Sequence, residues 1–196
     1  MLNMHTLPLG DYMTNCYLIW GDDSPTCCVI DPGYTPEEVL LRVKRLGKTV
    51  EAILLTHGHF DHVGGVKELA AQTGCQVYVC AEELALPHRL TSGPVYHTHT
   101  YAEGDVLELA GLTIRVMQTP GHTKGSVCLL AEDCMFAGDT LFQGSCGRTD
   151  LPGGDWAQIL QSLRRLKELP DETKVFSGHG PSSTIGDEKQ WNPYMR

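Results

Sequence analysis

The chain has 196 residues, of which 41% are hydrophobic and 20% charged, so it can bury a substantial core without disulfide support. Its 15 Lys and Arg residues against 24 Asp and Glu residues give a formal net charge of -9, which disfavours nucleic acid and anionic membrane surfaces as partners. No apolar run reaches the roughly 18 residues of a transmembrane helix, and the first residues lack the pattern of a signal peptide. We therefore expect a cytoplasmic protein that binds a small molecule.

The patterning of apolar residues predicts alternating strands and helices. Strands are predicted at residues 5–9, 16–20, 27–31, 50–55, 77–79, 106–109, 112–117, 126–130, 134–137 and 174–177. Helices are predicted near residues 35–46, 66–73, 81–86 and 155–166, with Thr35 and Asp155 as N-caps and Gly74 as a C-cap. Residues 87–104 are expected to be irregular.

The order of these elements predicts how they pack. Short turns join the first three strands, which indicates an antiparallel meander, and the strand-helix-strand order after residue 50 indicates a βαβ unit. In the helix after Asp155, one apolar stripe is expected to face the core. That stripe consists of Trp156, Ile159, Leu160, Leu163 and Leu166. No linker or short repeat interrupts the chain, so we expect one domain, residues 1–196, of two packed αβ halves.

The eight cysteines are expected to be free. None forms a CxxC pair, several lie inside apolar runs, and a chain of this length needs no disulfide framework. We therefore interpret most of them as buried thiols in a reducing compartment.

Potential metal ligands cluster just after the predicted strands, where sites in αβ sheets collect. They are His57, His59, Asp61 and His62 after the strand at 50–55, then His122, Asp139 and His179, with Asp31 as an outlying member. In the HxHxDH pattern, His57 and His59 can share one ion while Asp61 and His62 serve a second one. Imidazoles and carboxylates without thiolates suit zinc and also iron or manganese. The alternative is a solvated histidine-rich turn.

Four motifs carry a resemblance to a known family. They are Thr56-His57-Gly58-His59-Phe60-Asp61-His62, Thr119-Pro120-Gly121-His122-Thr123, Gly138-Asp139-Thr140 and Gly178-His179-Gly180. In this order they resemble the metallo-β-lactamase superfamily, and the stretch from Gly138 to Arg148 resembles the short bacterial form of glyoxalase II, the hydroxyacylglutathione hydrolases. The resemblance implies an α/β fold, a four-layer αββα sandwich.

The resemblance also implies roles for the ligands. His57, His59 and His122 would hold one divalent ion, and Asp61, His62 and His179 a second. Asp139 would bridge both, because two dications about 3.5–4 Å apart repel unless an anion lies between them. The catalytic residues would be Asp61 and Asp139, acting with a hydroxide between two ions, zinc being the first choice. The thiolate of a thioester leaves readily, so hydrolysis of an acyl-thiol such as S-D-lactoylglutathione needs no strong general acid.

Four further residues have an expected role and a plainer alternative. Asp31 could accept a hydrogen bond from the outer nitrogen of a ligand histidine, or be an ordinary turn residue, and Thr56 has the same two interpretations. Arg148 lies where glyoxalase II enzymes hold the substrate carboxylate, but it could instead pair with Asp150. Cys146 could approach the substrate, or be a packed thiol. In full-length glyoxalase II a further C-terminal helical region contributes to the glutathione site, and only a short segment follows His179 here.

Three other functions compete with thioester hydrolysis. A persulfide dioxygenase of the same superfamily resembles the chain around Gly147-Arg148-Thr149-Asp150, uses one iron, and leaves the positions of His62 and His179 unused. A lactonase, β-lactamase or phosphodiesterase is the second alternative, although β-lactamases of this fold usually have another residue at the position of Asp139. A non-catalytic metal-bearing module is the third.

Overall fold

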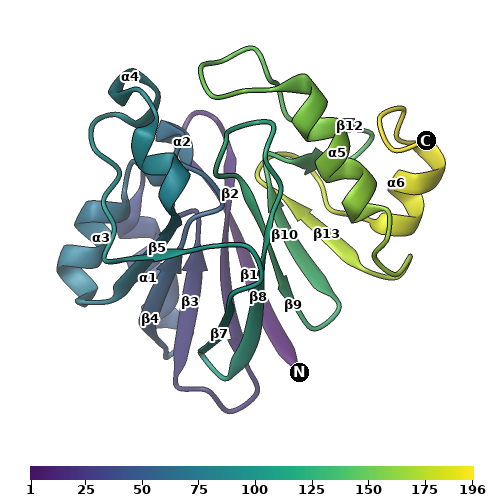
Figure 1. Ribbon diagram of the computed structural model, residues 1–196. Helices are drawn as coiled ribbons and strands as arrows, with labels where there is room; N and C mark the ends of the chain where they lie inside the picture. Colours follow the sequence, from purple (N-terminus) through teal and green to yellow (C-terminus); the bar gives the residue numbers. More distant parts are fainter.

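The computed structural model describes all residues, 1–196, and shows two six-stranded sheets stacked face to face between layers of helices (Figure 1). On the left of Figure 1, α1 (Pro36–Arg45) and α3 (Val66–Thr73) cover the first sheet. On the right, α5 (Trp156–Leu166) and α6 (Ile185–Trp191) cover the second sheet. The expected αββα sandwich is confirmed.

The first sheet has its strands in chain order. They are β1 (Leu2–Leu9), β2 (Thr14–Gly21), β3 (Thr26–Ile30), β4 (Thr49–Leu54), β5 (Gln76–Cys80) and β6 (His99–Tyr101). The first three are antiparallel, as the short turns predicted. From β3 onward the neighbours are parallel, because α1 and α3 return the chain to the start of the next strand.

The second sheet has the order β14-β13-β10-β9-β8-β7. Its strands are β7 (Val106–Leu109), β8 (Leu112–Gln118), β9 (Val127–Ala131), β10 (Cys134–Gly138), β13 (Lys174–Ser177) and β14 (Ser183–Thr184). Only β10 and β13 pair in parallel, across the long connection that holds α5. A small hairpin of β11 (Leu141–Phe142) and β12 (Ser145–Cys146) follows β10.

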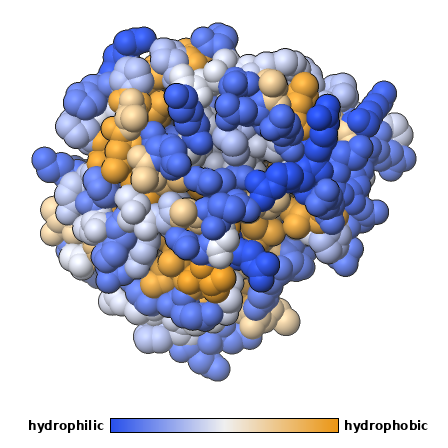
Figure 2. All heavy atoms as spheres, in the orientation of Figure 1, coloured by the Kyte–Doolittle hydropathy of each residue, from blue (hydrophilic) through white to orange (hydrophobic).

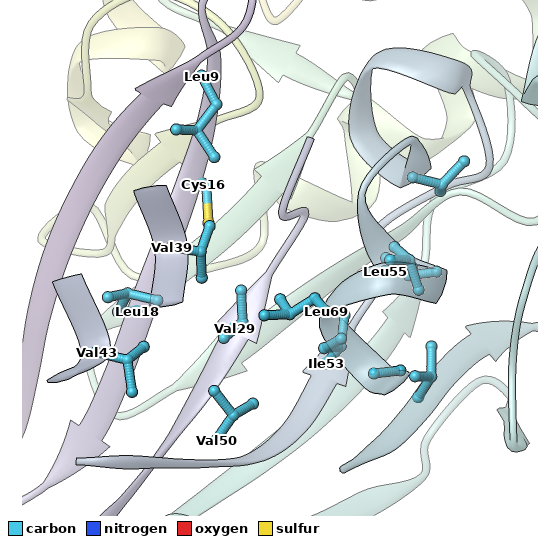
Figure 3. Packing of buried hydrophobic residues seen from close by; sticks show 14 of the residues in the cluster. Leu9, Cys16, Leu18, Val29, Val39, Val43, Val50, Ile53, Leu55 and Leu69 are labelled. Carbon is cyan, nitrogen blue, oxygen red and sulfur yellow. The ribbon is translucent and has the colours of Figure 1, made fainter. Parts of the chain in front are cut away.

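Three hydrophobic clusters fill the three spaces between the four layers. Alternate residues of one strand enter different clusters, as a pleated strand requires. In β2, Leu18 packs toward α1 and α3 in the cluster of Figure 3, whereas Ile19 packs against the second sheet. The third cluster lies under α5 and α6 and includes Leu163 and Met195. Both faces of the central sheets are therefore buried, which explains their nearly continuous apolar strands.

The helices match the sequence prediction in part. Asp155 caps α5 by accepting a hydrogen bond from the amide of Gln158, and Gly74 ends α3 in the left-handed conformation. Thr35 occupies the N-cap of α1 but its hydroxyl makes no cap bond, so the expected capping interaction is absent. Trp156 was expected on the buried stripe of α5 but is 49% exposed, because it lies at the helix start beyond the edge of the third cluster.

The region expected to be irregular contains regular structure. The short helix predicted near residues 81–86 is present as the 3-10 helix η1 (Ala81–Ala85). Within residues 87–104, the chain forms α4 (His88–Thr91) and β6. These two elements are too short for a periodic apolar pattern, so the prediction for residues 87–104 was wrong. Another short helix, α2 (Phe60–Val63), lies within the histidine-rich turn.

None of the helices is both long enough and apolar enough to cross a bilayer. The face shown in Figure 2 is mainly hydrophilic, with smaller hydrophobic patches between hydrophilic residues. All eight cysteines are free thiols, and six of them are buried.

Candidate metal centre

The potential ligands meet at one end of the two stacked sheets. From the first sheet, β4 leads into the turn that carries His57 and His59, and Asp61 and His62 lie on α2 directly behind it. From the second sheet, the loops after β8, β10 and β13 contribute the others. These are His122, Asp139 and His179. Residues far apart in the sequence therefore converge because their strands all end on the same side.

The first ligand group consists of His57, His59 and His122. All three side chains are buried, and one ring nitrogen from each lies within 4.8 Å of the others. Nδ1 of His59 and Nε2 of His122 are 2.9 Å apart. Burial lowers the pKa of all three imidazoles. For His59, burial and the neighbouring imidazoles together lower the pKa to about 4. These rings are therefore neutral at neutral pH, which is the form that binds a metal ion.

The second ligand group consists of Asp61, His62 and His179, again with one donor atom each within 4.8 Å. Oδ2 of Asp61 lies 3.1 Å from Nε2 of His179 and 3.5 Å from Nε2 of His62. Burial opposes charge on His62, but the carboxylates of Asp139 and Asp31 outweigh it and raise its pKa well above the usual value. Burial likewise opposes charge on His179, and the hydrogen bond to Asp61 nevertheless raises its pKa. The carboxylates around the second group thus favour a positive charge at this position.

Asp139 lies between the two groups. Its Oδ1 is 3.3 Å from Nε2 of His62, and its Oδ2 is 3.6 Å from Nε2 of His122 and of His179. Burial would raise the pKa of Asp139, but the surrounding imidazoles, above all His62, lower it below its usual range. One anionic carboxylate therefore contacts ligands of both groups.

Unsatisfied polar atoms at this site fit a metal ion. Among the buried side-chain atoms without a hydrogen-bond partner are Nε2 of His57, Nε2 of His62 and Oδ1 of Asp139. A buried polar atom without a partner costs about 1–3 kcal/mol, so such atoms are rare unless something else binds them. Imidazole nitrogens and carboxylate oxygens in this arrangement suit zinc, iron or manganese.

Asp31 and Thr56 lie behind the ligands. Oδ2 of Asp31 accepts hydrogen bonds from Nδ1 of His62 at 2.9 Å and from the hydroxyl of Thr56 at 2.6 Å, and its Oδ1 accepts one from the Thr56 amide. The same hydroxyl lies 3.2 Å from Nδ1 of His57. The structure therefore brings both residues against the outer nitrogens of ligand histidines, as the sequence analysis expected.

Arg148 and Cys146 have the surroundings of their structural alternatives, which are an ion pair with Asp150 and a packed thiol. The exposed guanidinium of Arg148 makes two hydrogen bonds of 2.7 Å to the carboxylate of Asp150, while its backbone carbonyl accepts a 2.8 Å hydrogen bond from Nδ1 of His122. Cys146 is half-buried against the third cluster, and burial raises the pKa of its thiol. Their proposed contacts with substrate stay predictions.

Two polar residues of β2 belong to the site and were missed by the sequence analysis. The hydroxyl of Thr14 donates to Oδ2 of Asp61 at 3.1 Å. Asn15 donates from its side chain to the carbonyls of Ser177 and Gly180, which flank His179. The strand was predicted to begin two residues later, so both residues were left outside it. The only sequence signal for them is that a polar pair precedes an apolar run.

The chain is similar in sequence and in fold to known proteins. Residues 9–179 match the profile of the Metallo-beta-lactamase superfamily. The chain is 34% identical over 209 residues to the hydroxyacylglutathione hydrolase GloC of Haemophilus influenzae, covering 99% of this chain and 98% of that protein. Its structure is similar to the crystal structure of the BLEG-1 B3 metallo-beta-lactamase, with a TM-score of 0.89, 38% identity and coverage of 100% and 99%. It is also similar to ETHE1 from Myxococcus xanthus, with a TM-score of 0.86, 30% identity and coverage of 97% and 83%.

Proposed function

Because this chain belongs to the metallo-beta-lactamase superfamily, we propose that it is a hydrolase that cleaves a thioester with the help of two metal ions. The proposed substrate is S-D-lactoylglutathione or a related acyl-thiol. The observation that carries the proposal is the position of Asp139 between two complete groups of three ligands. Similarity to a hydroxyacylglutathione hydrolase along nearly its whole length supports the substrate class.

The first ligand group would hold one ion and the second group the other, with Asp139 contacting both. Zinc is the first choice, and iron and manganese accept the same donor atoms. When bound, such ions supply hydroxide from water at neutral pH and polarise a carbonyl oxygen. The anionic carboxylates of Asp61 and Asp139 offset part of the positive charge that the centre gains on loading.

The chain itself orients the imidazoles. Asp31 accepts a hydrogen bond from Nδ1–H of His62, and the carbonyl of Arg148 accepts one from Nδ1–H of His122. In the neutral form of each ring, Nε2 is then the nitrogen without a proton and can act as a ligand. The carbonyl of Tyr12 does the same for His179.

The chemistry of a thioester fits a site with little acid catalysis. A thiol with a pKa of about 8.5 leaves as its anion without a proton from the protein. Cys146 is poorly suited to act as a nucleophile, since burial raises the pKa of its thiol and disfavours the thiolate.

Arg148 is proposed to bind a carboxylate of the substrate, which would replace the carboxylate of Asp150 in its ion pair. Because both partners of this ion pair are exposed, the pair is weak and a ligand carboxylate can replace it. Replacing Arg148 with Ala should raise KM for a glutathione thioester and change kcat little, whereas replacing the exposed Arg89 should change neither. An unchanged KM for Arg148→Ala would remove this role.

The central experiment measures metal content and thioester turnover on one preparation. We expect about two ions per chain and loss of S-D-lactoylglutathione hydrolysis on chelation, restored by adding the metal back. Protein that holds its metal and leaves every tested acyl-thiol intact would overturn the thioester assignment.

A persulfide dioxygenase is the second candidate, because the structure is similar to ETHE1. The variant His179→Ala separates the two, since it removes one ligand of the second group only. A two-ion thioesterase should lose its second ion and its activity, whereas a one-iron dioxygenase should keep consuming oxygen with glutathione persulfide. A β-lactam substrate belongs in the same assay, given the similarity to BLEG-1.

A further inference from the structure

We propose that Glu83 is a positioning residue that fixes the first ligand group by tying two ligand-bearing loops together. Glu83 lies on η1, outside every motif that points to the metal centre, and is completely buried. Its Oε2 accepts a 2.6 Å hydrogen bond from the amide of Gly58, and its Oε1 accepts a 2.8 Å hydrogen bond from the amide of Gly125. This inference rests on the metal centre of the proposed function and is independent of its substrate.

The two amides belong to the two halves of the first ligand group. Gly58 stands between His57 and His59, on the loop that follows the first sheet. Gly125 belongs to the loop that begins at His122 and leads into β9 of the second sheet. One carboxylate thus sets the separation of these loops, and a shift of either amide would move a ligand imidazole relative to its partners.

The glycines leave space that the carboxylate fills. A Cβ added at Gly125 would lie 2.8 Å from Oε1 and 2.9 Å from Cγ of Glu83. A Cβ added at Gly58 would lie 3.2 Å from Oε2. Neither glycine has a positive φ, so close packing explains the absence of a side chain, against Glu83 alone at Gly125 and against Leu86 and Glu83 at Gly58.

The carboxylate has no cationic partner in the chain. No Lys, Arg or His lies within ion-pair distance of Glu83, although burying a carboxylate without a counter-charge is costly. Burial raises its pKa, while hydrogen bonds from Thr123 and the two glycine amides work in the opposite direction. The three imidazoles of the first group are neutral, so a dication bound there would supply positive charge on the far side of these loops.

The test compares Zn²⁺ affinity in two backgrounds that isolate the ligand groups. His179→Ala leaves the first group intact, and His122→Ala leaves the second intact. We expect Glu83→Gln to weaken Zn²⁺ binding about 10–100-fold in the His179→Ala background and to leave it unchanged in the His122→Ala background. Affinity is read by chelator competition, and the visible spectrum of bound Co²⁺ reports the ligand geometry. Glu82→Gln, at an exposed neighbouring position, is the matched control and should change neither.

Two results would overturn the inference. One is unchanged affinity in the His179→Ala background, and the other is an equal loss in both backgrounds, which would show a general structural role. If Glu83→Gln does not fold, Gly125→Ala displaces the carboxylate while keeping its charge, and the same pattern is required of it. Wild-type protein that binds no metal would overturn the proposed function as well, whereas wild type with two ions and an unaffected Glu83→Gln would overturn this inference alone.

Discussion

The backbone of Asp31 has an unusual conformation that serves its side chain. Its φ of 49° lies in the left-handed region, which costs a non-glycine residue about 1–2 kcal/mol. This conformation directs the carboxylate toward Thr56 and His62. The three hydrogen bonds that it accepts there offset the cost of the backbone conformation. Local strain of this kind is typical of functional sites.

We expect Asp31→Ala to weaken metal binding at the second ligand group about 10–100-fold, because Nδ1 of His62 loses its acceptor. Asp23→Ala is the control, since Asp23 also has a positive φ but is exposed. Chelator competition with Zn²⁺ measures both variants. Equal affinities of Asp31→Ala and the control would contradict the role given to Asp31.

Gly121 has no room for a side chain beside a proposed ligand. It precedes His122 and has a φ of 142°, and an added Cβ would lie 2.3 Å from Cβ and 2.4 Å from Cα of Ile159 on α5. The closeness of α5 to this loop therefore depends on glycine.

Gly121→Ala is expected to lower the free energy of unfolding by about 2–3 kcal/mol more than Gly144→Ala does. Gly144 also has a positive φ, 68° against 142° for Gly121, but no atom lies within 4 Å of its added Cβ. The difference between the two variants therefore contains the clash with Ile159 and the greater backbone strain at 142°. Urea unfolding provides the measurement. A similar cost for the two substitutions would show that α5 moves away easily.

At the residue scale, the sequence pointed to the candidate ligands more clearly than to the residues that contact them. HxHxDH and the strand-end positions of the other three ligands are local signals, and the structure brings all seven residues together. Thr14, Asn15 and Glu83 contact backbone or carboxylate groups that are distant in the sequence. Such contacts depend on how the sheets pack and leave no spacing to recognise.

Among the elements, α6 supports the β11–β12 hairpin beside Asp139. Asn192, at its end, is fully buried and donates hydrogen bonds to the carbonyls of Ser145 and Phe142. It also donates to the carboxylate of Glu188, which accepts a further hydrogen bond from the Gly144 amide.

Asn192→Ala should lower the free energy of unfolding by about 2–3 kcal/mol, because the carbonyls of Ser145 and Phe142 lose this donor and the carboxylate of Glu188 keeps only the Gly144 amide. Faster hydrogen exchange at the Gly144 amide would show that the hairpin is the part released. Asn3→Ala is the control, since the hydrogen bonds of Asn3 are exposed. An exchange rate equal to that of wild type would contradict the bracing role.

Element length decided which elements could be predicted. The strand at Lys174–Ser177 was predicted with its observed bounds, and α5 within one residue, because each has a clear apolar pattern and α5 also has a cap. The hairpin of β11 and β12 and the strand β14 have two residues per strand, too few for any periodicity. Helix α6 was not predicted either.

For the whole molecule, the raised pKa values of buried thiols predict how the free energy of unfolding depends on pH. Burial raises the pKa of Cys27 and Cys128 to about 11 and that of Cys80 to about 12, from the usual 9.0. Above pH 9 these thiols ionise in the unfolded chain but stay protonated in the folded one. The unfolded state then holds fewer protons, so the free energy of unfolding falls as pH rises from about 9 to 11.

Urea unfolding between about pH 8 and pH 11 should show this decline. Cys128→Ala removes one of the contributing thiols and should make the decline shallower, although it also costs some packing at every pH. A stability that is constant over this range would show that the thiols ionise equally in both states.

The pairing of strands was the part of the global fold that the sequence could not supply. Parallel neighbours such as β3 and β4, or β10 and β13, are joined by long connections, so local patterns do not reveal which strand lies beside which. The resemblance to a known family supplied the sandwich, and the three interlayer clusters explain why it is stable.

Each ligand group takes two side chains from the first sheet's half of the chain and one from the second's. Coordination would therefore cross-link the halves twice, and the energy of binding would add directly to the energy that keeps them docked. The supply of metal in the cell would then affect how long the folded protein survives. Metal starvation would lower its folding stability and expose it to proteolysis.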